Sequence, residues 1–385
     1  MNSRERVKVA LDHKEPDRIP FDFGGTALTS ISRFNYNNFR VALGLPAVIP
    51  KVMDIFQQNI LVDEDMFSLL ECDVRPVLPE SPFGFSYDIQ KSSDGYSSIV
   101  DEWGIGWKKP IENGLYYDMF SHPLNGELSI ERLKSFPWPN PSDHNRFLGM
   151  YKEANHYAVN ESKAVALHGF CSGVVEMAAW LRGYSDFYLD IAQNDTALAY
   201  LLDKIVELKE AYWEVALSEA GDNVDVIIEA DDMAGQFNLL ISPISYRKIV
   251  KPRHKKLFQF IKDRTSAKLF FHSCGSIRPL IPDLIEIGVD ILNPVQVNAK
   301  GMNSAELKKE YGDAITFWGG GVDTQGAFGS SDPQVFRVDN DVRNRIIDFK
   351  PNGGFIFATV HNIQANVAVE NIVAMWNKFK ELRSY

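Results

Sequence analysis

The sequence has few cysteines, no long apolar run and no excess of basic residues, and each absence excludes a class of protein. Three cysteines among 385 residues are too few for a disulfide framework, so we expect a reducing, cytoplasmic setting. No window approaches about 18 consecutive apolar residues, and the N-terminus has no apolar signal-peptide core, so no membrane span is expected. Basic residues number 40 against 51 acidic ones, and the net charge of −11 argues against nucleic acid as a partner.

What the sequence does contain is an alternation of short apolar runs and helical segments after about residue 160. Six β-branched or aromatic runs recur there, and two earlier runs, 18–23 and 71–77, bring the total to eight. Runs that are apolar on both faces are typical of a buried parallel sheet. No GxGxxG phosphate fingerprint follows the first run, so the count predicts an α/β fold of the (β/α)8 TIM-barrel type rather than an open sheet. The six later runs are residues 164–169, 224–229, 268–272, 289–293, 315–319 and 354–358.

Helices are expected at the N-terminus, where Ser3 can cap a segment ending near Leu11, and between the later strands. We expect residues 1–385 to form one barrel domain, irregular to about residue 160 and regular over 161–385. Within this N-terminal elaboration, residues 97–107 alternate like a hairpin. The expected later helices are residues 195–220, 276–287, 303–311 and 367–382. Four aromatic residues could form a lid or rim over the barrel: Trp103, Trp107, Tyr116 and Tyr117.

In a (β/α)8 barrel the chemistry lies at the C-terminal ends of the strands. His272 and Cys274 follow the run 268–272, and side chains at i and i+2 of an extended segment point the same way. An imidazole and a thiolate so placed suit zinc. Zinc needs a third protein ligand, for which His361 is the first candidate and Cys171 and Glu229 compete. The alternative interpretation is a half-buried histidine beside an inert thiol.

Three carboxylates, Glu229, Asp231 and Asp232, crowd the end of the run 224–229. Mutual repulsion or burial would raise the pKa of at least one and make it a general acid, whereas a nearby cation would keep it ionised. The alternative is that Asp232 caps the next segment. The histidines outside the strand ends, His254 among them, are expected at the surface. Further candidates for substrate binding at the strand ends are His168, Cys171, Gln236, Gln296, Asp323 and Asn362.

Four segments resemble the uroporphyrinogen decarboxylase superfamily, and the similarity extends along nearly the whole chain. The superfamily fold is a (β/α)8 barrel, in agreement with the strand count. The matching segments are residues 4–20, 230–252, 271–275 and 353–364.

Two activities compete within that superfamily. Its decarboxylases carry an arginine-rich N-terminal segment that grips the substrate carboxylates, whereas residues 21–32 contain no arginine. The corrinoid-linked methyltransferases carry a zinc motif, His-x-Cys, with a distant third cysteine. His272 and Cys274 match its first half, and the distant position falls on His361. The resemblance therefore implies a zinc-dependent methyltransferase, with a metal-independent decarboxylase of a carboxylated substrate as the alternative.

In the methyltransferase branch, a methyl group moves between an O-, N- or S-methyl substrate, or a thiol or pterin acceptor, and a corrinoid. The chain has no DxHxxG cobalamin motif, so the resemblance implies that a partner protein supplies the corrinoid. It also implies zinc on His272, Cys274 and His361, with Glu229 as a possible fourth ligand. Asp231 or Asp232 would act as acid or substrate anchor. A barrel that only binds a ligand is the non-enzymatic alternative.

Overall fold

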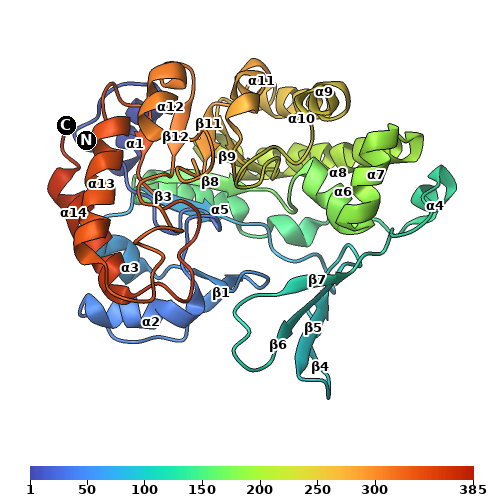
Figure 1. The fold of residues 1–385 in the computed structure, drawn as a ribbon, viewed down its shortest axis with the longest axis horizontal. Helices are drawn as coiled ribbons and strands as arrows, with labels where there is room; N and C mark the ends of the chain where they lie inside the picture. The colour runs from blue at the N-terminus through green and yellow to red at the C-terminus, as the bar shows by residue number, and fades with distance from the viewer.

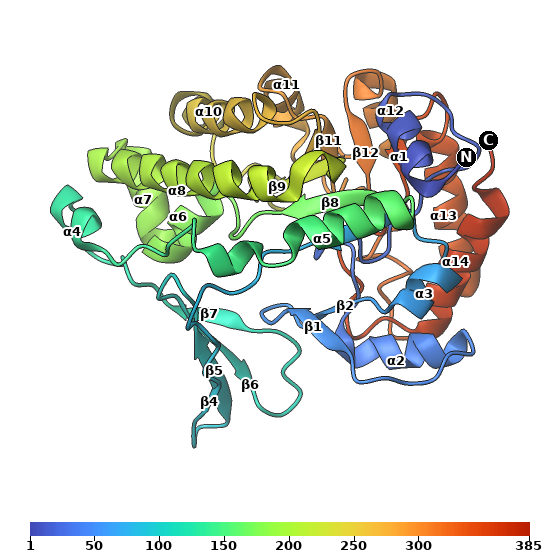
Figure 2. The same ribbon diagram turned by 180° about the vertical axis from the view of Figure 1, so that it is seen from behind.

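The computed structural model describes residues 1–385, and a curled sheet of seven parallel strands forms its centre (Figure 1). The order across the sheet is β13-β12-β11-β10-β9-β8-β3, and helices lie outside it (Figure 2). Seven of the eight runs predicted from the sequence form these strands. They are β3 (Val74–Val77), β8 (Ala164–His168), β9 (Val226–Ala230), β10 (Lys268–His272), β11 (Ile291–Asn293), β12 (Thr316–Trp318) and β13 (Phe355–Ile356).

The eighth run, residues 18–23, closes the barrel between β13 and β3. Phe21 pairs in parallel with Phe357, and the Asp22 N–H donates to the Phe357 carbonyl over 2.9 Å. On its other side the Asp73 N–H donates to the Phe21 carbonyl, also over 2.9 Å. Because Pro20 has no N–H to donate, the run makes isolated bridges rather than a regular ladder. The two edges of the sheet are thereby joined, and the predicted TIM-barrel fold is confirmed.

Helices between and around the strands largely occupy the predicted segments. The segment 276–287 is a 3₁₀ turn at Arg278–Leu280 that continues into a short α-helix. No helix combines the length and the apolar character needed to cross a membrane. The helices of the barrel are α1 (Ser3–Leu11), α5 (Met150–Asn155), α6 (Val174–Arg182), α7 (Tyr184–Gln193), α8 (Thr196–Ala220), α9 (Pro243–Ser245), α10 (Lys251–Lys262), α11 (Ile281–Glu286), α12 (Ser304–Tyr311), α13 (Val335–Phe349) and α14 (Val369–Leu382).

The cap of α1 differs by one residue from the prediction. Asn2 rather than Ser3 precedes the helix, and its Oδ1 accepts from the Glu5 N–H over 2.9 Å. The Glu5 carboxylate accepts in return from the Asn2 N–H over 3.0 Å. This reciprocal pair is a capping box, and it satisfies two N–H groups that a helix start leaves free.

The N-terminal elaboration contains two small antiparallel sheets, one of which projects away from the barrel (Figures 1 and 2). The predicted hairpin at 97–107 is part of the projecting sheet. The two sheets consist of β1 (Lys51–Asp54) with β2 (Asn59–Leu61), and of β4 (Gln90–Lys91), β5 (Tyr96–Val100), β6 (Gly106–Pro110) and β7 (Asp118–Ser121). The helices of this region are α2 (Arg33–Ala42), α3 (Glu64–Leu69) and α4 (Ile130–Ser135).

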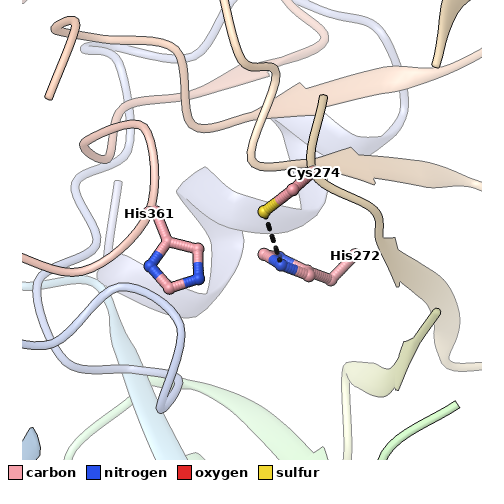
Figure 3. Close-up of side chains that lie close together, drawn as sticks. All are labelled: His272, Cys274 and His361. Carbon is pink, nitrogen blue, oxygen red and sulfur yellow. Dashed lines mark hydrogen bonds between the residues drawn. The ribbon is translucent and has the colours of Figure 1, made fainter. Parts of the chain in front are cut away.

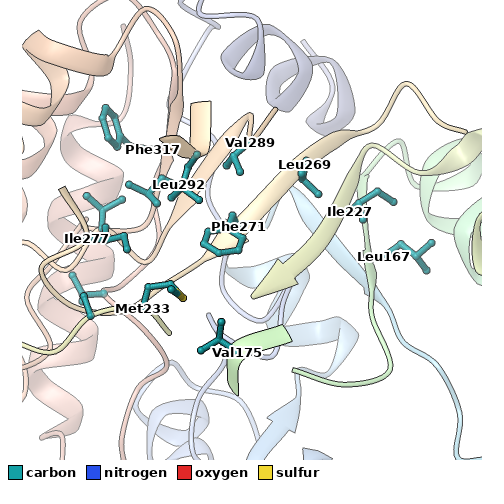
Figure 4. Close-up of a cluster of buried hydrophobic side chains, with 14 of the residues drawn as sticks. Leu167, Val175, Ile227, Met233, Leu269, Phe271, Ile277, Val289, Leu292 and Phe317 are labelled. Atoms are coloured by element: carbon teal, nitrogen blue, oxygen red, sulfur yellow. The ribbon is translucent and has the colours of Figure 1, made fainter. Parts of the chain in front are cut away.

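Successive side chains of each strand point to opposite sides of the sheet, so the apolar core has an outer and an inner part. The same alternation positions the side chains of the site. In β10, Leu269 and Phe271 point outward into the large apolar cluster under the helices (Figure 4), whereas Phe270 belongs to the smaller cluster inside the barrel. Burying side chains of this size stabilises the fold by about 1.5–3 kcal/mol each. His272 follows Phe270 by two residues, so the same alternation directs its imidazole to the inner side at the C-terminal end of β10.

Candidate metal centre at the barrel mouth

Three side chains that the sequence analysis proposed as metal ligands lie together (Figure 3). His272 ends β10, Cys274 follows it in the loop, and His361 lies in the loop after β13. Their candidate ligand atoms are all within 4.8 Å of one another, and the Cys274 Sγ lies 3.3 Å from the His272 Nε2. Donor atoms around a tetrahedral zinc are about 3.3–3.8 Å apart, so this nitrogen and sulfur set fits zinc after small side-chain adjustments.

An asparagine from the neighbouring strand determines which nitrogen of His272 is free. The Asn293 Nδ2 donates to the Trp318 carbonyl over 2.8 Å, so the amide oxygen faces the imidazole. That Oδ1 lies 2.5 Å from the His272 Nδ1, which therefore carries the proton. The lone pair of Nε2 is left to bind a metal, as in many metal-ligating histidines.

A second asparagine orients His361 in the same way. The Asn362 Nδ2 donates to the Gln57 Oε1 over 2.9 Å and to the Asn59 Oδ1 over 2.8 Å, and its own Oδ1 lies 2.5 Å from the His361 Nδ1. Burial, with a smaller effect from the charge of His272, lowers the pKa of His361 to about 4. The ring is therefore neutral at pH 7 with a free Nε2. Asn362, proposed from the sequence to bind substrate, thus contacts the candidate ligand.

Cys274 is the third candidate ligand, and Asp232 lies beside it. The Asp232 Oδ1 accepts from the Cys274 N–H over 2.7 Å, and the Asp232 side chain is 36% exposed. Burial and the negative charge of Asp232 raise the pKa of the Cys274 thiol well above its usual range. A bound divalent cation reverses this balance and favours the thiolate.

Asp231 has a different environment from its neighbour. It is fully buried, and its carboxylate accepts from the N–H groups of Val175 and Glu176, each over 2.8 Å, at the start of α6. Gly173 precedes that helix and has no side chain to cap it. The third partner is the His254 Nε2 at 2.8 Å. These contacts hold a helix start in place and leave Asp232 as the accessible aspartate.

The expectation of a surface position for His254 was wrong. Its side chain is 2% exposed and packs on Phe271 in addition to its contact with Asp231. The polar residues around it in α10, Lys251–Lys262, suggested an exposed segment. One face of the helix nevertheless packs on the barrel, and His254 lies on that face.

Glu229 and Cys171, the two other residues considered for the third ligand position, contact Lys209 instead. Glu229 is 3% exposed, and its carboxylate binds the Lys209 Nζ at 3.0 Å and the Trp213 Nε1 at 2.6 Å. The Cys171 Sγ lies 3.9 Å from the same Lys209 Nζ. Neither residue belongs to the group of converging ligand atoms.

Glu176 is a neighbour of the centre that the sequence analysis missed. Burial, followed by the charges of Asp232 and Asp231, raises the pKa of Glu176 to about 8. Its carboxylate accepts from the Ser172 hydroxyl over 2.6 Å. An acidic residue in the first turn of a helix usually signals only a favourable interaction with the helix dipole, so the sequence offered no way to single it out.

Gln236, Gln296 and Asp323 form a hydrogen-bonded network behind the Cys274 loop. The Gln296 Oε1 accepts from the Gly275 N–H over 2.8 Å, and its Nε2 donates to the Gln236 Oε1 over 2.7 Å. Asn298 extends the network, because its Nδ2 donates to the Asp323 Oδ1 over 2.8 Å. These partners position the loop that carries the thiol.

His168, the last residue of β8, has an unusual environment. Its side chain is buried, and its Nε2 has no hydrogen-bond partner. Burial lowers the pKa of His168 to about 4, so the ring is neutral at pH 7.

One solved structure agrees with this architecture. A methyltransferase from Methanosarcina mazei superposes with a TM-score of 0.65 at 17% identity, over 99% of each chain, and this likeness shows the shared fold. A GH113 β-1,4-mannanase gives a TM-score of only 0.37 at 8% identity, over 95% of this chain and 99% of the other. A search of curated sequences gave no match.

The remaining comparison is with models of protein families. The model of uroporphyrinogen decarboxylase (URO-D) matches residues 120–382, which include every residue of the candidate metal centre. This range covers more than half of the chain and most of the barrel strands. The chain therefore belongs to the uroporphyrinogen decarboxylase family.

Proposed function

We propose that the protein is a zinc-dependent methyltransferase. It would move a methyl group between a small O-, N- or S-methyl compound, or a thiol or pterin acceptor, and a corrinoid carried by a partner protein. The observation that carries the proposal is the convergence of His272, Cys274 and His361 at the barrel mouth. Family membership and the fold shared with a methyltransferase support it.

The side chains have distinct roles in this proposal. His272, Cys274 and His361 would hold zinc through three atoms, which leaves a fourth position open for a substrate heteroatom. When bound, zinc acts as a Lewis acid that activates a thiol or polarises an ether or amine. Asp232, partly exposed beside Cys274, would hold or supply a proton at the substrate heteroatom. Asp231 would support α6 and would not take part in the chemistry.

The alternative, a metal-independent decarboxylase, needs cations to hold a carboxylated substrate. Residues 21–32, which close the barrel and lead into α2, contain no lysine or arginine. Arg33 follows and stacks on Phe34, with 4.8 Å between the guanidinium carbon and the ring centroid. This region therefore favours the methyltransferase over the decarboxylase.

Metal analysis tests the proposal directly. We expect protein purified without chelators to contain about one zinc per chain. His272→Ala, Cys274→Ala and His361→Ala should each lose most of it. Two matched controls should keep it: His156→Ala, in which a half-exposed imidazole is removed, and Cys171→Ala.

Activity provides the second readout. Wild-type protein should transfer methyl groups between a panel of methylated compounds and added cobalamin, seen as the change in the cobalamin absorbance spectrum. A wild-type chain that binds no zinc, or one that releases CO₂ from a carboxylated substrate without metal, would contradict the proposal.

A further inference from the structure

Three carboxylates around the metal centre have no cationic partner. Glu176, Asp232 and Asp54 form no ion pair with any lysine or arginine, although all three are partly exposed. Two well-buried carboxylates elsewhere are paired with cations: Asp73 binds two arginines, and Asp225 binds an arginine and a lysine. Unneutralised carboxylates at a site mouth attract a positively charged ligand.

Hydrogen bonds connect these carboxylates to the metal ligands from two sides. On one side the Asp54 Oδ1 accepts from the Gln57 N–H over 3.2 Å. The Gln57 side chain in turn accepts from the Asn362 amide, and Asn362 contacts the candidate ligand His361. On the other side Asp232 accepts from the Cys274 N–H. Asp232 therefore contacts the metal centre directly, and Asp54 is connected to it through Gln57 and Asn362.

Aromatic side chains bridge the distance between the two sides. The Phe56 and Trp107 ring centroids are 4.4 Å apart, and Trp107 meets Trp180 edge to face at 5.4 Å. Trp180 lies four residues after Glu176 in α6, so the indole and the carboxylate share one face of the helix. The Trp180 Nε1 also donates to the Tyr184 hydroxyl over 3.2 Å.

Together these contacts form a ring that starts and ends at the metal centre. We call it the acidic–aromatic ring. It consists of Asp54, Phe56, Trp107, Trp180, Glu176 and Asp232.

The composition of this ring selects for one kind of ligand. Aromatic faces attract cations, and ammonium groups bind them most strongly when tryptophan is present. Zinc held by a single thiolate carries one net positive charge, and no lysine or arginine pairs with the three carboxylates beside it. An anionic substrate would therefore find no protein cation to bind, whereas a cationic substrate would have carboxylates as partners.

We propose that the substrate of this centre carries an alkylammonium group, which the acidic–aromatic ring binds while the reacting heteroatom lies at the metal ligands. This inference deepens the proposed methyltransferase function by naming the charge and chemical class of its substrate.

A comparison of three ligands of similar shape tests it. Choline has a trimethylammonium head, 3,3-dimethylbutan-1-ol replaces that nitrogen by carbon, and 3,3-dimethylbutanoate carries a negative charge. Each has a nine-proton methyl signal, so NMR titration of the purified full-length protein measures all three. We expect choline to bind at least about tenfold more tightly than the alcohol, and the carboxylate to bind most weakly.

Substitutions in the acidic–aromatic ring test whether these residues cause the tighter binding of choline. Glu176→Gln and Trp180→Leu, made singly and together, should reduce the advantage of choline over the alcohol to less than about threefold. Glu219→Gln removes an exposed carboxylate from α8 and should leave the advantage unchanged. Equal binding of choline and the alcohol, or an advantage that survives in the double variant, would overturn the inference.

The same titration separates this inference from the proposed function. Choline binding needs neither metal nor methyl transfer, so it is measured both before and after treatment with a chelator. Protein that binds zinc and transfers methyl groups without preferring choline would disprove only the inference. Protein that prefers choline but never binds zinc would support the ring and disprove the zinc methyltransferase.

Discussion

Each imidazole of the candidate metal centre is held by an asparagine that is itself held by other groups. Asn293 is anchored by the Trp318 carbonyl, and Asn362 by Gln57 and Asn59. Since each asparagine determines the tautomer of one histidine, both residues should affect metal affinity without binding the metal.

Replacing Asn293 by alanine should therefore weaken zinc binding by about 10–100-fold, because the His272 ring loses the acceptor that fixes its proton on Nδ1. Competition with a chromophoric chelator measures this change. Asn366→Ala, at an exposed asparagine, is the control and should keep wild-type affinity. Unchanged affinity in a folded Asn293 variant would show that the tautomer is not controlled in this way.

A second prediction concerns His168 and acid stability. Its pKa is about 4 in the folded protein against an ordinary value near 6.5, so between these values the unfolded chain binds the proton and the folded chain does not. The free energy of unfolding should consequently fall as the pH drops from about 6.5 to 4. His168→Gln should reduce the loss between pH 6.5 and pH 5 by about 2 kcal/mol, measured by urea unfolding. An identical pH slope in the variant would contradict the expected role of this histidine.

Local spacing explains which site residues could be found in the sequence. His272 and Cys274 stand out because they follow a strand two residues apart. His361 was the first candidate for the third ligand because it follows the last predicted strand, and the family resemblance pointed to the same position. Glu176 was missed because an acidic residue in the first turn of a helix is common, and His254 because it lies among polar residues of α10. Only the packing of each helix against the barrel shows the environment of these side chains.

Among the elements, α6 depends on a group from outside its own sequence. Gly173 leaves the first N–H groups of the helix without a local cap, and Asp231, just after β9, supplies the missing acceptor. A methyl group on Gly173 would lie 2.1 Å from the Ala230 carbonyl oxygen, so only glycine allows this approach. The helix that carries Glu176 and Trp180 is thereby positioned by the strand that leads to Asp232.

Asp231→Ala should accordingly destabilise the protein by about 3–5 kcal/mol, because it leaves His254 without its buried carboxylate and the helix start without its acceptor. Asp231→Asn should cost less, since the amide oxygen can still accept one hydrogen bond. Urea unfolding measures both values, with the exposed Asp222→Ala as control. A small effect of the alanine variant would mean that Asp231 does not support α6.

Elements of the barrel were predictable to within a few residues, because runs buried on both faces are continuously apolar. The small sheets of the first 160 residues were largely missed, apart from the β5–β6 hairpin. Their strands are two to five residues long, too short for a clear period, and they pack on only part of the barrel. The run 18–23 was recognised as a strand, but its proline prevented a regular ladder.

For the molecule as a whole, the proposal requires a second protein. The purified chain should show no cobalamin absorbance, and it should transfer methyl groups only when a corrinoid protein or free cobalamin is added. Affinity capture from the native cells, followed by absorbance spectroscopy of the captured protein, tests for the partner. Cobalamin that co-purifies with the isolated chain and survives denaturing separation from other proteins would contradict the proposal. A single domain and a cytoplasmic location remain predictions.

The seam of the barrel has a consequence for synthesis. Phe21 must meet Phe357, so a ribosome has to translate nearly the whole message before the circle of strands can be completed. Until then the nascent polypeptide exposes two strands with unpaired backbone N–H and C=O groups, which can pair with other chains. A premature stop shortly before residue 355 should therefore yield aggregates rather than a shortened but working enzyme, and sedimentation of the truncated product would reveal them.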